Sequence, residues 1–194
     1  INLSVSFMER GPIDWVSAME KFRGNDFYIV HFNRQPGVAD ASFASNPRNF
    51  LRNLYRAEQW NAPKRPHRPG MALINMVTET DPLGKLIMSE EELEVFVRAF
   101  ETSGFTGPIN WYRNFARNWE IIGRVPQRVE QPSLMIYGRH DMVRPSDRMG
   151  NYVPDLEVHT LDCGHWIQQE KPEDTNRIIC LLYTSPSPRD RTRS

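Results

Sequence analysis

Two strand-like segments near the end of the chain each run directly into a side chain that can carry charge. Residues 133–141 (Ser-Leu-Met-Ile-Tyr-Gly-Arg-His-Asp) are typical of a buried strand that ends at the carboxylate of Asp141. Residues 156–165 form a second strand pattern, which ends at the imidazole of His165. An acid and then a histidine, on the loops after consecutive strands, is the order of the last two members of a nucleophile–acid–histidine triad.

Each of these two residues alone has an ordinary explanation. Aspartate is common in turns, and a loop histidine is often satisfied by backbone groups. The order and the placement after two strands together favour the catalytic interpretation. A histidine can take a proton from water near neutral pH, and a carboxylate on its other ring nitrogen selects the tautomer and stabilises the imidazolium.

The third member of such a triad is absent from the sequence. No Gly-x-Ser-x-Gly or Gly-x-Asp-x-Gly turn occurs in the 194 residues. We therefore expect the nucleophile to lie outside these residues. We also expect this chain alone to be inactive.

Composition excludes several other classes of function. The formal net charge is zero and no basic stripe is present, which argues against a nucleic-acid partner. No apolar run reaches membrane-spanning length, so we expect a cytoplasmic protein without a membrane segment. The two cysteines are too few for a disulfide framework or a metal site, and we expect no metal or other cofactor.

The patterns divide the chain into a helical block between two pieces of α/β pattern. Residues 1–7 alternate apolar and polar side chains, as a strand does. Residues 8–125 are mainly helical in pattern; Ser89 and Glu92, for example, have the spacing of a capping box. Residues 126–179 contain the two strands and a helix that starts near Glu173. The expected fold class is α/β, with a mostly helical lid inserted between core strands.

The pattern changes again at residues 180–194. Residues 180–190 (Cys-Leu-Leu-Tyr-Thr-Ser-Pro-Ser-Pro-Arg-Asp) match, residue for residue, the translation of a transposon-type sequencing adapter. We expect this tail to be a read-through artefact; the alternative is a natural disordered tail.

Three motifs carry a resemblance to a known family. They are residues 27–28 (Phe-Tyr) before 35–39 (Gln-Pro-Gly-Val-Ala), residues 107–114 (Gly-Pro-Ile-Asn-Trp-Tyr-Arg-Asn), and residues 162–166 (Asp-Cys-Gly-His-Trp) before 171–173 (Lys-Pro-Glu). With these motifs the chain resembles epoxide hydrolases of the α/β-hydrolase fold from about Ile1 to Ile179. It differs from the commoner pattern by one added residue at Asn33-Arg34 and by His31 in place of an aromatic residue.

The resemblance implies a role for each of four residues. Tyr28 and Tyr112 match the two lid tyrosines that hydrogen-bond the epoxide oxygen, Asp141 matches the triad acid, and His165 matches the general base. An aspartate nucleophile would open the epoxide to an ester, and activated water would hydrolyse the ester to a vicinal diol. The expected partners are a small apolar epoxide and water. Four neighbouring residues could line an apolar pocket or simply pack in the core: Phe27, Ile29, Met142 and Trp166.

Two alternatives remain open from the sequence. A haloalkane or fluoroacetate dehalogenase, or another α/β-hydrolase with a lid, shares the same acid and histidine, although paired tyrosines favour an epoxide. A non-catalytic truncated chain is the second alternative. Neither the specific substrate nor the oligomeric state can be derived from the sequence.

Overall fold

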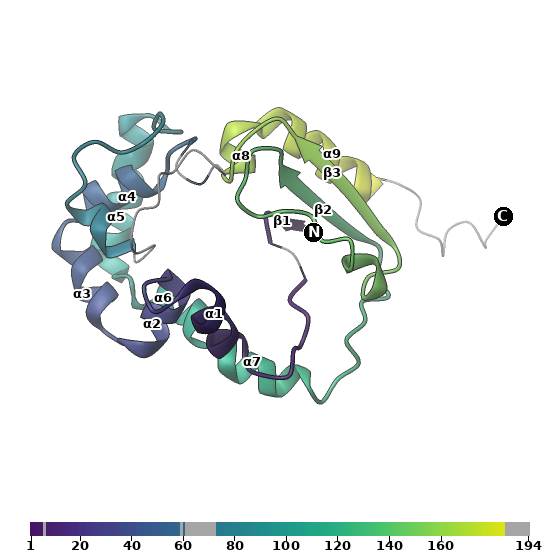
Figure 1. Cartoon of the computed structure of the whole chain (residues 1–194). Coiled ribbons are helices and arrows are strands. Elements are labelled where there is room, and N and C mark those ends of the chain that lie inside the picture. The colour runs from purple at the N-terminus through teal and green to yellow at the C-terminus, as the bar shows by residue number, and fades with distance from the viewer. Residues whose placement is uncertain (6, 59, 61–72, 185–194) are drawn as a thin grey trace. The chain divides into compact units, whose positions relative to one another are not determined.

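The computed structural model describes residues 1–5, 7–58, 60 and 73–184, with side chains as far as residue 182 (Figure 1). The chain divides into two compact units. The first, called here the core unit, consists of Ile1–Phe7, Trp60–Ala62 and Val129–Ser194. The second, called the helical unit, consists of Met8–Gln59 and Pro63–Arg128.

The core unit is built on a three-stranded parallel sheet in the order β1-β2-β3. Its elements are β1 (Asn2–Leu3), β2 (Ser133–Gly138), η2 (Met149–Asn151), β3 (Leu156–Leu161), α8 (Ile167–Glu170) and α9 (Pro172–Thr184). The pairing of Ser133 with Leu156 sets the register of β2 and β3, and it runs to Gly138 and Leu161. The two strands therefore end side by side, and the loops that follow them leave the same edge of the sheet.

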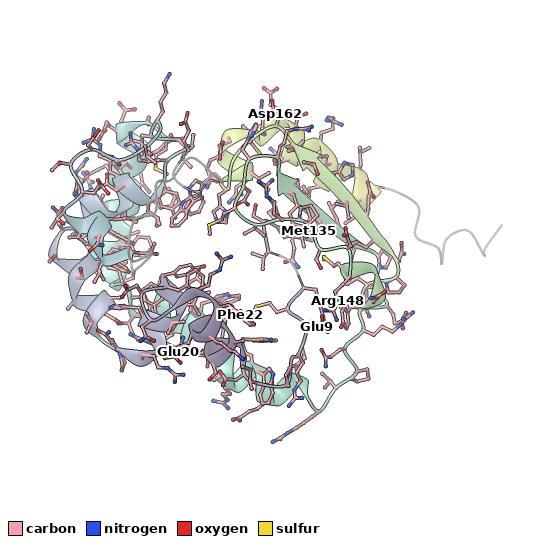
Figure 2. All side chains as sticks on the ribbon, in the orientation of Figure 1. Glu9, Glu20, Phe22, Met135, Arg148 and Asp162 are labelled. Carbon is pink, nitrogen blue, oxygen red and sulfur yellow. The ribbon has the colours of Figure 1, made fainter. Side chains whose placement is uncertain are left out.

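The central strand, β2, is buried on both faces. Leu134 and Ile136 pack with Cys163, Ile167 and Ile178 on one face. Met135, labelled in Figure 2, and Tyr137 pack with Met149 and Val153 on the other face. Burial on both faces explains why this strand is a continuous apolar run rather than an alternating one.

The first strand is shorter than the alternation over residues 1–7 predicts. β1 ends at Leu3, and Ser4 adopts a left-handed backbone with φ of 52°. The Ser4 amide still donates to the carbonyl of Ile136 at 3.0 Å, but a left-handed residue turns the chain out of the extended conformation. At the described residues beyond Leu3, the alternation therefore does not correspond to strand.

The last helix, α9, is longer than the sequence predicts. The sequence pattern predicts a helix that ends at Ile179, whereas α9 continues to Thr184. The first proline of the tail is Pro186, and the helical conformation is disfavoured only from the residue before it. The remainder of the predicted tail, residues 185–194, lies outside the described residues, so its proposed origin stays a prediction.

The helical unit contains seven α-helices and one 3-10 helix within its described residues. They are α1 (Trp15–Arg23), α2 (Tyr28–Arg34), α3 (Val38–Ser45), α4 (Pro47–Leu54), η1 (Leu73–Val77), α5 (Glu90–Ser103), α6 (Thr106–Arg113) and α7 (Phe115–Ile122). Aromatic rings make much of its interior. Phe43 stacks on Phe50 with ring centroids 3.8 Å apart, and Phe105 meets Phe50 edge-on at 5.4 Å.

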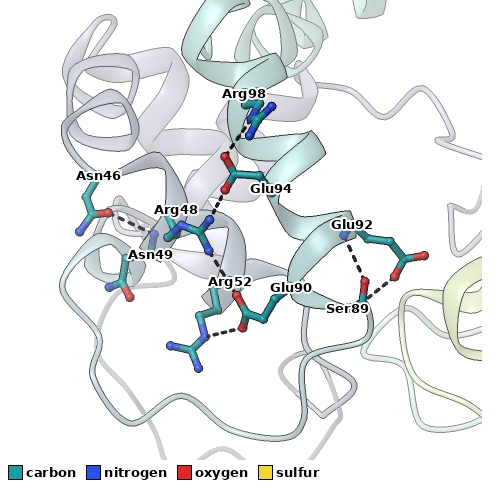
Figure 3. Close-up of polar contacts among 9 residues, drawn as sticks. All are labelled: Asn46, Arg48, Asn49, Arg52, Ser89, Glu90, Glu92, Glu94 and Arg98. Carbon is teal, nitrogen blue, oxygen red and sulfur yellow. Dashed lines mark hydrogen bonds and ion pairs between the residues drawn. The ribbon is translucent and has the colours of Figure 1, made fainter.

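The start of α5 follows the sequence prediction closely. The Ser89 side chain accepts from the Glu92 amide at 3.1 Å, and the Glu92 carboxylate accepts from the Ser89 amide at 2.7 Å (Figure 3). Along the same helix Glu94 pairs with Arg98 and with Arg48 of α4. These pairs are largely exposed, so each adds little to stability. Among the residues that the structure describes, no helix is long and apolar enough to cross a membrane.

Candidate active site

The turns after β2 and β3 bring Asp141 and His165 into direct contact. His165 Nδ1 lies 3.0 Å from each carboxylate oxygen of Asp141. The Asp141 side chain is fully buried, and its Oδ1 also accepts the amide of Val143 at 3.0 Å. The His165 side chain is 28% exposed, so its other nitrogen, Nε2, belongs to a ring that solvent can reach.

The Asp141 carboxyl group is held in its charged form. Burial by itself raises the pKa of Asp141, but the hydrogen bond and positive charge of His165, with hydrogen bonds from Ser4 and Val143, outweigh burial and lower the pKa. The carboxylate is therefore ionised at neutral pH and binds the N–H of His165 Nδ1. With Nδ1 protonated, Nε2 is the nitrogen that can accept a proton.

Backbone contacts fix how closely the turn that carries His165 packs against the end of β2. A Cβ atom at Gly138 would lie 1.9 Å from the carbonyl oxygen of Gly164, so only glycine allows the two turns to touch. The Glu170 carboxylate of α8 accepts the amides on both sides of the histidine, from Gly164 at 2.9 Å and from Trp166 at 3.1 Å. The histidine backbone is thus held from both directions.

A second cluster of predicted site residues lies in the helical unit. Tyr28 begins α2 and Tyr112 is near the end of α6. Their rings meet edge-on, with centroids 5.3 Å apart. Burial raises the pKa of Tyr28, and the neighbouring Tyr112 phenol adds to the shift. Burial likewise raises the pKa of Tyr112. Both phenols are therefore protonated at neutral pH and can act as hydrogen-bond donors.

Three side chains, called here the α2–α6 clamp, join the helices that carry these tyrosines: Asn33, Asp40 and Arg113. The Asn33 amide donates to the carbonyl of Ile29 at 2.7 Å and to the carbonyl of Tyr112 at 3.2 Å. The Arg113 guanidinium donates to the carbonyl of Phe32 at 3.1 Å and pairs with Asp40 at 2.5 Å. The clamp thus ties the backbone beside each tyrosine to the neighbouring helix.

The four predicted pocket residues separate into two groups. Met142 follows Asp141 directly, and the Trp166 ring lies 5.1 Å from the His165 ring. The Phe27 ring centroid lies 4.8 Å from that of Tyr28. Ile29, the residue after Tyr28 in α2, is buried, with 5% of its surface exposed. Their contribution to substrate binding stays a prediction.

Several residues of these clusters were not predicted from the sequence. Trp60, whose ring lies 6.0 Å from that of His165, comes from a distant part of the chain. Its carbonyl accepts the amide of Met142 at 3.0 Å. Ser4, Glu170 and the α2–α6 clamp were also missed. Arg113 stands in the motif of residues 107–114, but the resemblance implied no role for it. Trp60, Ser4, Glu170, Asn33 and Asp40 stand in none of the three motifs, although the added residue at Asn33-Arg34 pointed to a local difference in α2.

Comparison with known proteins identifies epoxide hydrolases as sequence relatives. No protein-family model matches the sequence. The chain is 35% identical over 187 residues to Bifunctional epoxide hydrolase 2 of Sus scrofa, which covers 92% of this chain and 33% of that protein. It is 36% identical over 194 residues to Epoxide hydrolase A of Mycobacterium tuberculosis, covering 94% of this chain and 60% of that protein. The chain thus spans about 60% of the mycobacterial relative and about a third of the mammalian one.

Solved structures lead to the same family. Epoxide Hydrolase A from Mycobacterium thermoresistibile superposes with a TM-score of 0.78 at 29% identity, over 94% of this chain and 60% of that one. Potato epoxide hydrolase I superposes with a TM-score of 0.78 at 27% identity, over 95% of this chain and 61% of that one. Sequence and structure together show that the chain is a homologue of the epoxide hydrolases and shares their α/β-hydrolase fold over the part of those enzymes that it spans.

Proposed function

We propose that this chain supplies the general base and the oxygen-binding groups of an enzyme that hydrolyses a small apolar epoxide to a vicinal diol. The observation that carries the proposal is the Asp141–His165 pair, in which a buried carboxylate orients a solvent-accessible imidazole. Two further observations support epoxide hydrolysis as the reaction. The phenols of Tyr28 and Tyr112 are paired and protonated, and the sequence relatives are epoxide hydrolases. We also propose that the protein works in the cytoplasm, in keeping with the free thiol of Cys163.

In the first step of the proposed reaction an epoxide ring opens. An aspartate carboxylate, which we expect outside these 194 residues, attacks one ring carbon, and the bond from that carbon to the ring oxygen breaks. The oxygen leaves as an alkoxide, which is a poor leaving group. Tyr28 and Tyr112 would donate hydrogen bonds to it, and one phenol would supply the proton. Neutral phenols can do this without a metal ion.

In the second step the ester is hydrolysed. His165 takes a proton from water at Nε2 while Asp141 stabilises the imidazolium through Nδ1. The hydroxide attacks the ester carbonyl, and collapse of the tetrahedral intermediate breaks the bond between the carbonyl carbon and the substrate oxygen. The imidazolium of His165 gives its proton to this departing oxygen, which completes the diol. The proton of the new carboxylic acid returns to the phenolate, so the aspartate carboxylate, the phenol and the neutral imidazole are all restored. The aromatic rings of Phe27 and Trp166, next to Tyr28 and His165, favour an apolar substituent on the substrate.

The decisive experiment is a trapping experiment on the full-length protein that contains these residues. His165→Gln keeps an N–H donor for Asp141 but cannot act as a base. We expect this variant to open the epoxide once and to stop as the ester, which intact-protein mass spectrometry detects as a gain of the whole substrate mass. His140→Gln is the matched control, because His140 is an exposed histidine on the neighbouring turn. It should turn over normally.

Two results would contradict the proposal. One is full diol formation by His165→Gln. The other is a wild-type protein that leaves epoxides intact but releases halide from a haloalkane, which would favour the dehalogenase alternative. A halide leaves without a proton, so that reaction would not need a phenol as a proton donor.

A further inference from the structure

Ser4, at the end of β1, has an unusual backbone for its residue type. Its φ is 52°, and within the described part of the chain it is the one non-glycine residue with a positive φ. It is also buried, with 4% of its surface exposed. A left-handed conformation costs free energy in any residue with a Cβ atom, and such residues are concentrated at functional sites. Ser4 therefore calls for a functional explanation.

The contacts of Ser4 place it against the Asp141–His165 pair. Its amide donates to the carbonyl of Ile136 at 3.0 Å, which is the last rung between β1 and β2. Its Oγ lies 3.4 Å from the carbonyl oxygen of His165, at the long end of the range for a hydrogen bond. A hydrogen bond from the same hydroxyl to Asp141 is one of the causes that lower the pKa of that carboxyl group.

A serine hydroxyl has one proton, so it can donate to only one of these two acceptors at a time. The carboxylate is the stronger acceptor, because hydrogen bonds to an ionised group are shorter and stronger than those to a neutral carbonyl. Asp141 is fully buried and receives donors from His165 and Val143. The Ser4 hydroxyl, from the residue that follows β1, adds a third donor to a carboxylate that solvent does not reach.

We propose that Ser4 is a positioning residue, whose hydroxyl donates to the Asp141 carboxylate and holds it in the orientation that binds His165 Nδ1. The proposal rests on the proposed function, in which His165 is the general base. The left-handed residue carries its hydroxyl against the pair, 3.4 Å from the carbonyl oxygen of His165. The titratable groups near the pair include Cys163 in the same turn, Glu170 in α8, and the neighbouring Asp162 and Lys171. All of them stay unchanged in the variants below.

The test compares three substitutions of Ser4 in the full-length protein. Ser4→Ala removes the hydroxyl and keeps the backbone cost. Ser4→Gly removes the hydroxyl and the backbone cost together. Ser4→Asn keeps a donor, and asparagine tolerates the left-handed region better than most residues. The control is Ser133→Ala, which removes a hydroxyl that donates to the carbonyl of Gln131 at the start of β2.

Two quantities are measured for each variant, the pKa of the His165 imidazole by NMR and the rate of ester hydrolysis in single turnover. With one donor lost, the Asp141 carboxylate attracts the imidazolium more strongly, so the pKa of His165 should rise in Ser4→Ala and Ser4→Gly. Loss of a hydrogen bond to a charged group should slow ester hydrolysis about 10-fold. Ser4→Asn should recover most of the rate, and Ser133→Ala should match the wild type.

The outcomes separate the two proposals. Unchanged titration and rate in both Ser4→Ala and Ser4→Gly would overturn the role of Ser4. A slow Ser4→Ala beside a Ser4→Gly with the wild-type rate would also overturn it, because the loss would then come from the backbone strain and not from the missing hydroxyl. If no variant and no wild-type protein hydrolyses an epoxide, the proposed function fails, while the NMR titration still decides whether Ser4 acts on the pair. If Ser4→Ala does not fold, Ser4→Gly and Ser4→Asn still give the comparison.

Discussion

Removal of the Arg113 guanidinium should loosen the helical unit around the two tyrosines. In the α2–α6 clamp this group pairs with Asp40 at 2.5 Å and donates to the carbonyl of Phe32 at 3.1 Å. Arg113→Met keeps the length and apolar stem of the side chain but removes both interactions. The expected result is a less stable helical unit and, in the full-length protein, slower epoxide opening, because α6 loses its hydrogen bond to Phe32 of α2 and its ion pair with Asp40 of α3.

The magnitude follows from the burial of the pair. The side chains of Arg113 and Asp40 are 19% and 16% exposed. An exposed pair contributes about 0–1 kcal/mol, whereas breaking a fully buried pair costs about 3–5 kcal/mol. A pair between these limits should cost about 2 kcal/mol. In a chain of this size each kcal/mol moves the Tm by about 2–4 °C, so the expected loss is about 4–8 °C.

The assay is a double-mutant cycle by thermal unfolding with Arg113→Met, Asp40→Asn and the double variant. The coupling free energy between the two side chains should be about 1.5 kcal/mol. Arg113→Lys is the matched control: it keeps the charge but cannot bind the carboxylate and the Phe32 carbonyl together, so it should recover only part of the stability. A coupling energy below about 0.3 kcal/mol would refute the argument, because the pair would then act as an ordinary surface contact.

The same pair should show a defined pH dependence. Burial raises the pKa of Asp40, but hydrogen bonds from Arg113 and Thr106 outweigh burial and lower it. A carboxyl group with a lowered pKa in the folded state stabilises that state fully above its unfolded pKa of about 3.9. The contribution is lost as the pH falls through the lower folded-state value. The difference in Tm between wild type and Arg113→Met should therefore be constant near neutral pH and shrink only below about pH 4.

Three further predictions concern single groups. Tyr28→Phe combined with Tyr112→Phe should lower the rate of epoxide opening at least about 100-fold by stopped-flow kinetics, since both oxygen donors are lost; either single variant at wild-type rate would show that one phenol suffices. Cys163 is buried, and its pKa is raised by burial and by the charge of Glu170 to about 11, so a thiol reagent should label exposed Cys180 in the folded protein and Cys163 only after unfolding. Glu170→Gln leaves one carboxamide oxygen to accept two amides and should slow ester hydrolysis about 10-fold while the protein stays folded, and an unchanged rate would refute the positioning role.

Local sequence determined the placement of the acid and the histidine on turns after strands. The apolar run before Asp141 predicted a buried strand, and β2 is that strand. The spacing of Ser89 and Glu92 predicted a capping box, and both of its hydrogen bonds are present. The predicted α/β-hydrolase fold is confirmed by the structures of the potato and mycobacterial enzymes. The buried strand and the capping box each depend on residues close together in the chain, whereas the fold was expected from motifs spread between residues 27 and 173.

Two boundaries were wrong because pattern does not fix where an element stops. The alternation of residues 1–7 suits a strand, but the left-handed backbone of Ser4 ends β1 at Leu3. At the other end, apolar residues after Ile179 continue the helix to Thr184. At Ser4 the end is set by a single backbone conformation, to which the hydrophobic pattern is insensitive. After Ile179 the sequence allows a helix as far as the residues before the first proline, Pro186, so a change in pattern did not mark its end.

Only the tertiary structure decided which distant groups meet. The parallel register of β2 and β3 puts the ends of the two strands at one edge, and that register brings Asp141 to 3.0 Å from His165. Packing of α2 on α6 sets the contact between Tyr28 and Tyr112, and no spacing in the sequence could give it. By itself the sequence determined the residue types and the local conformations, because propensity and periodicity act over a few residues. Contacts between residues far apart in the chain depend on how the elements pack, which is why Ser4, Glu170 and the α2–α6 clamp emerged only from the folded chain.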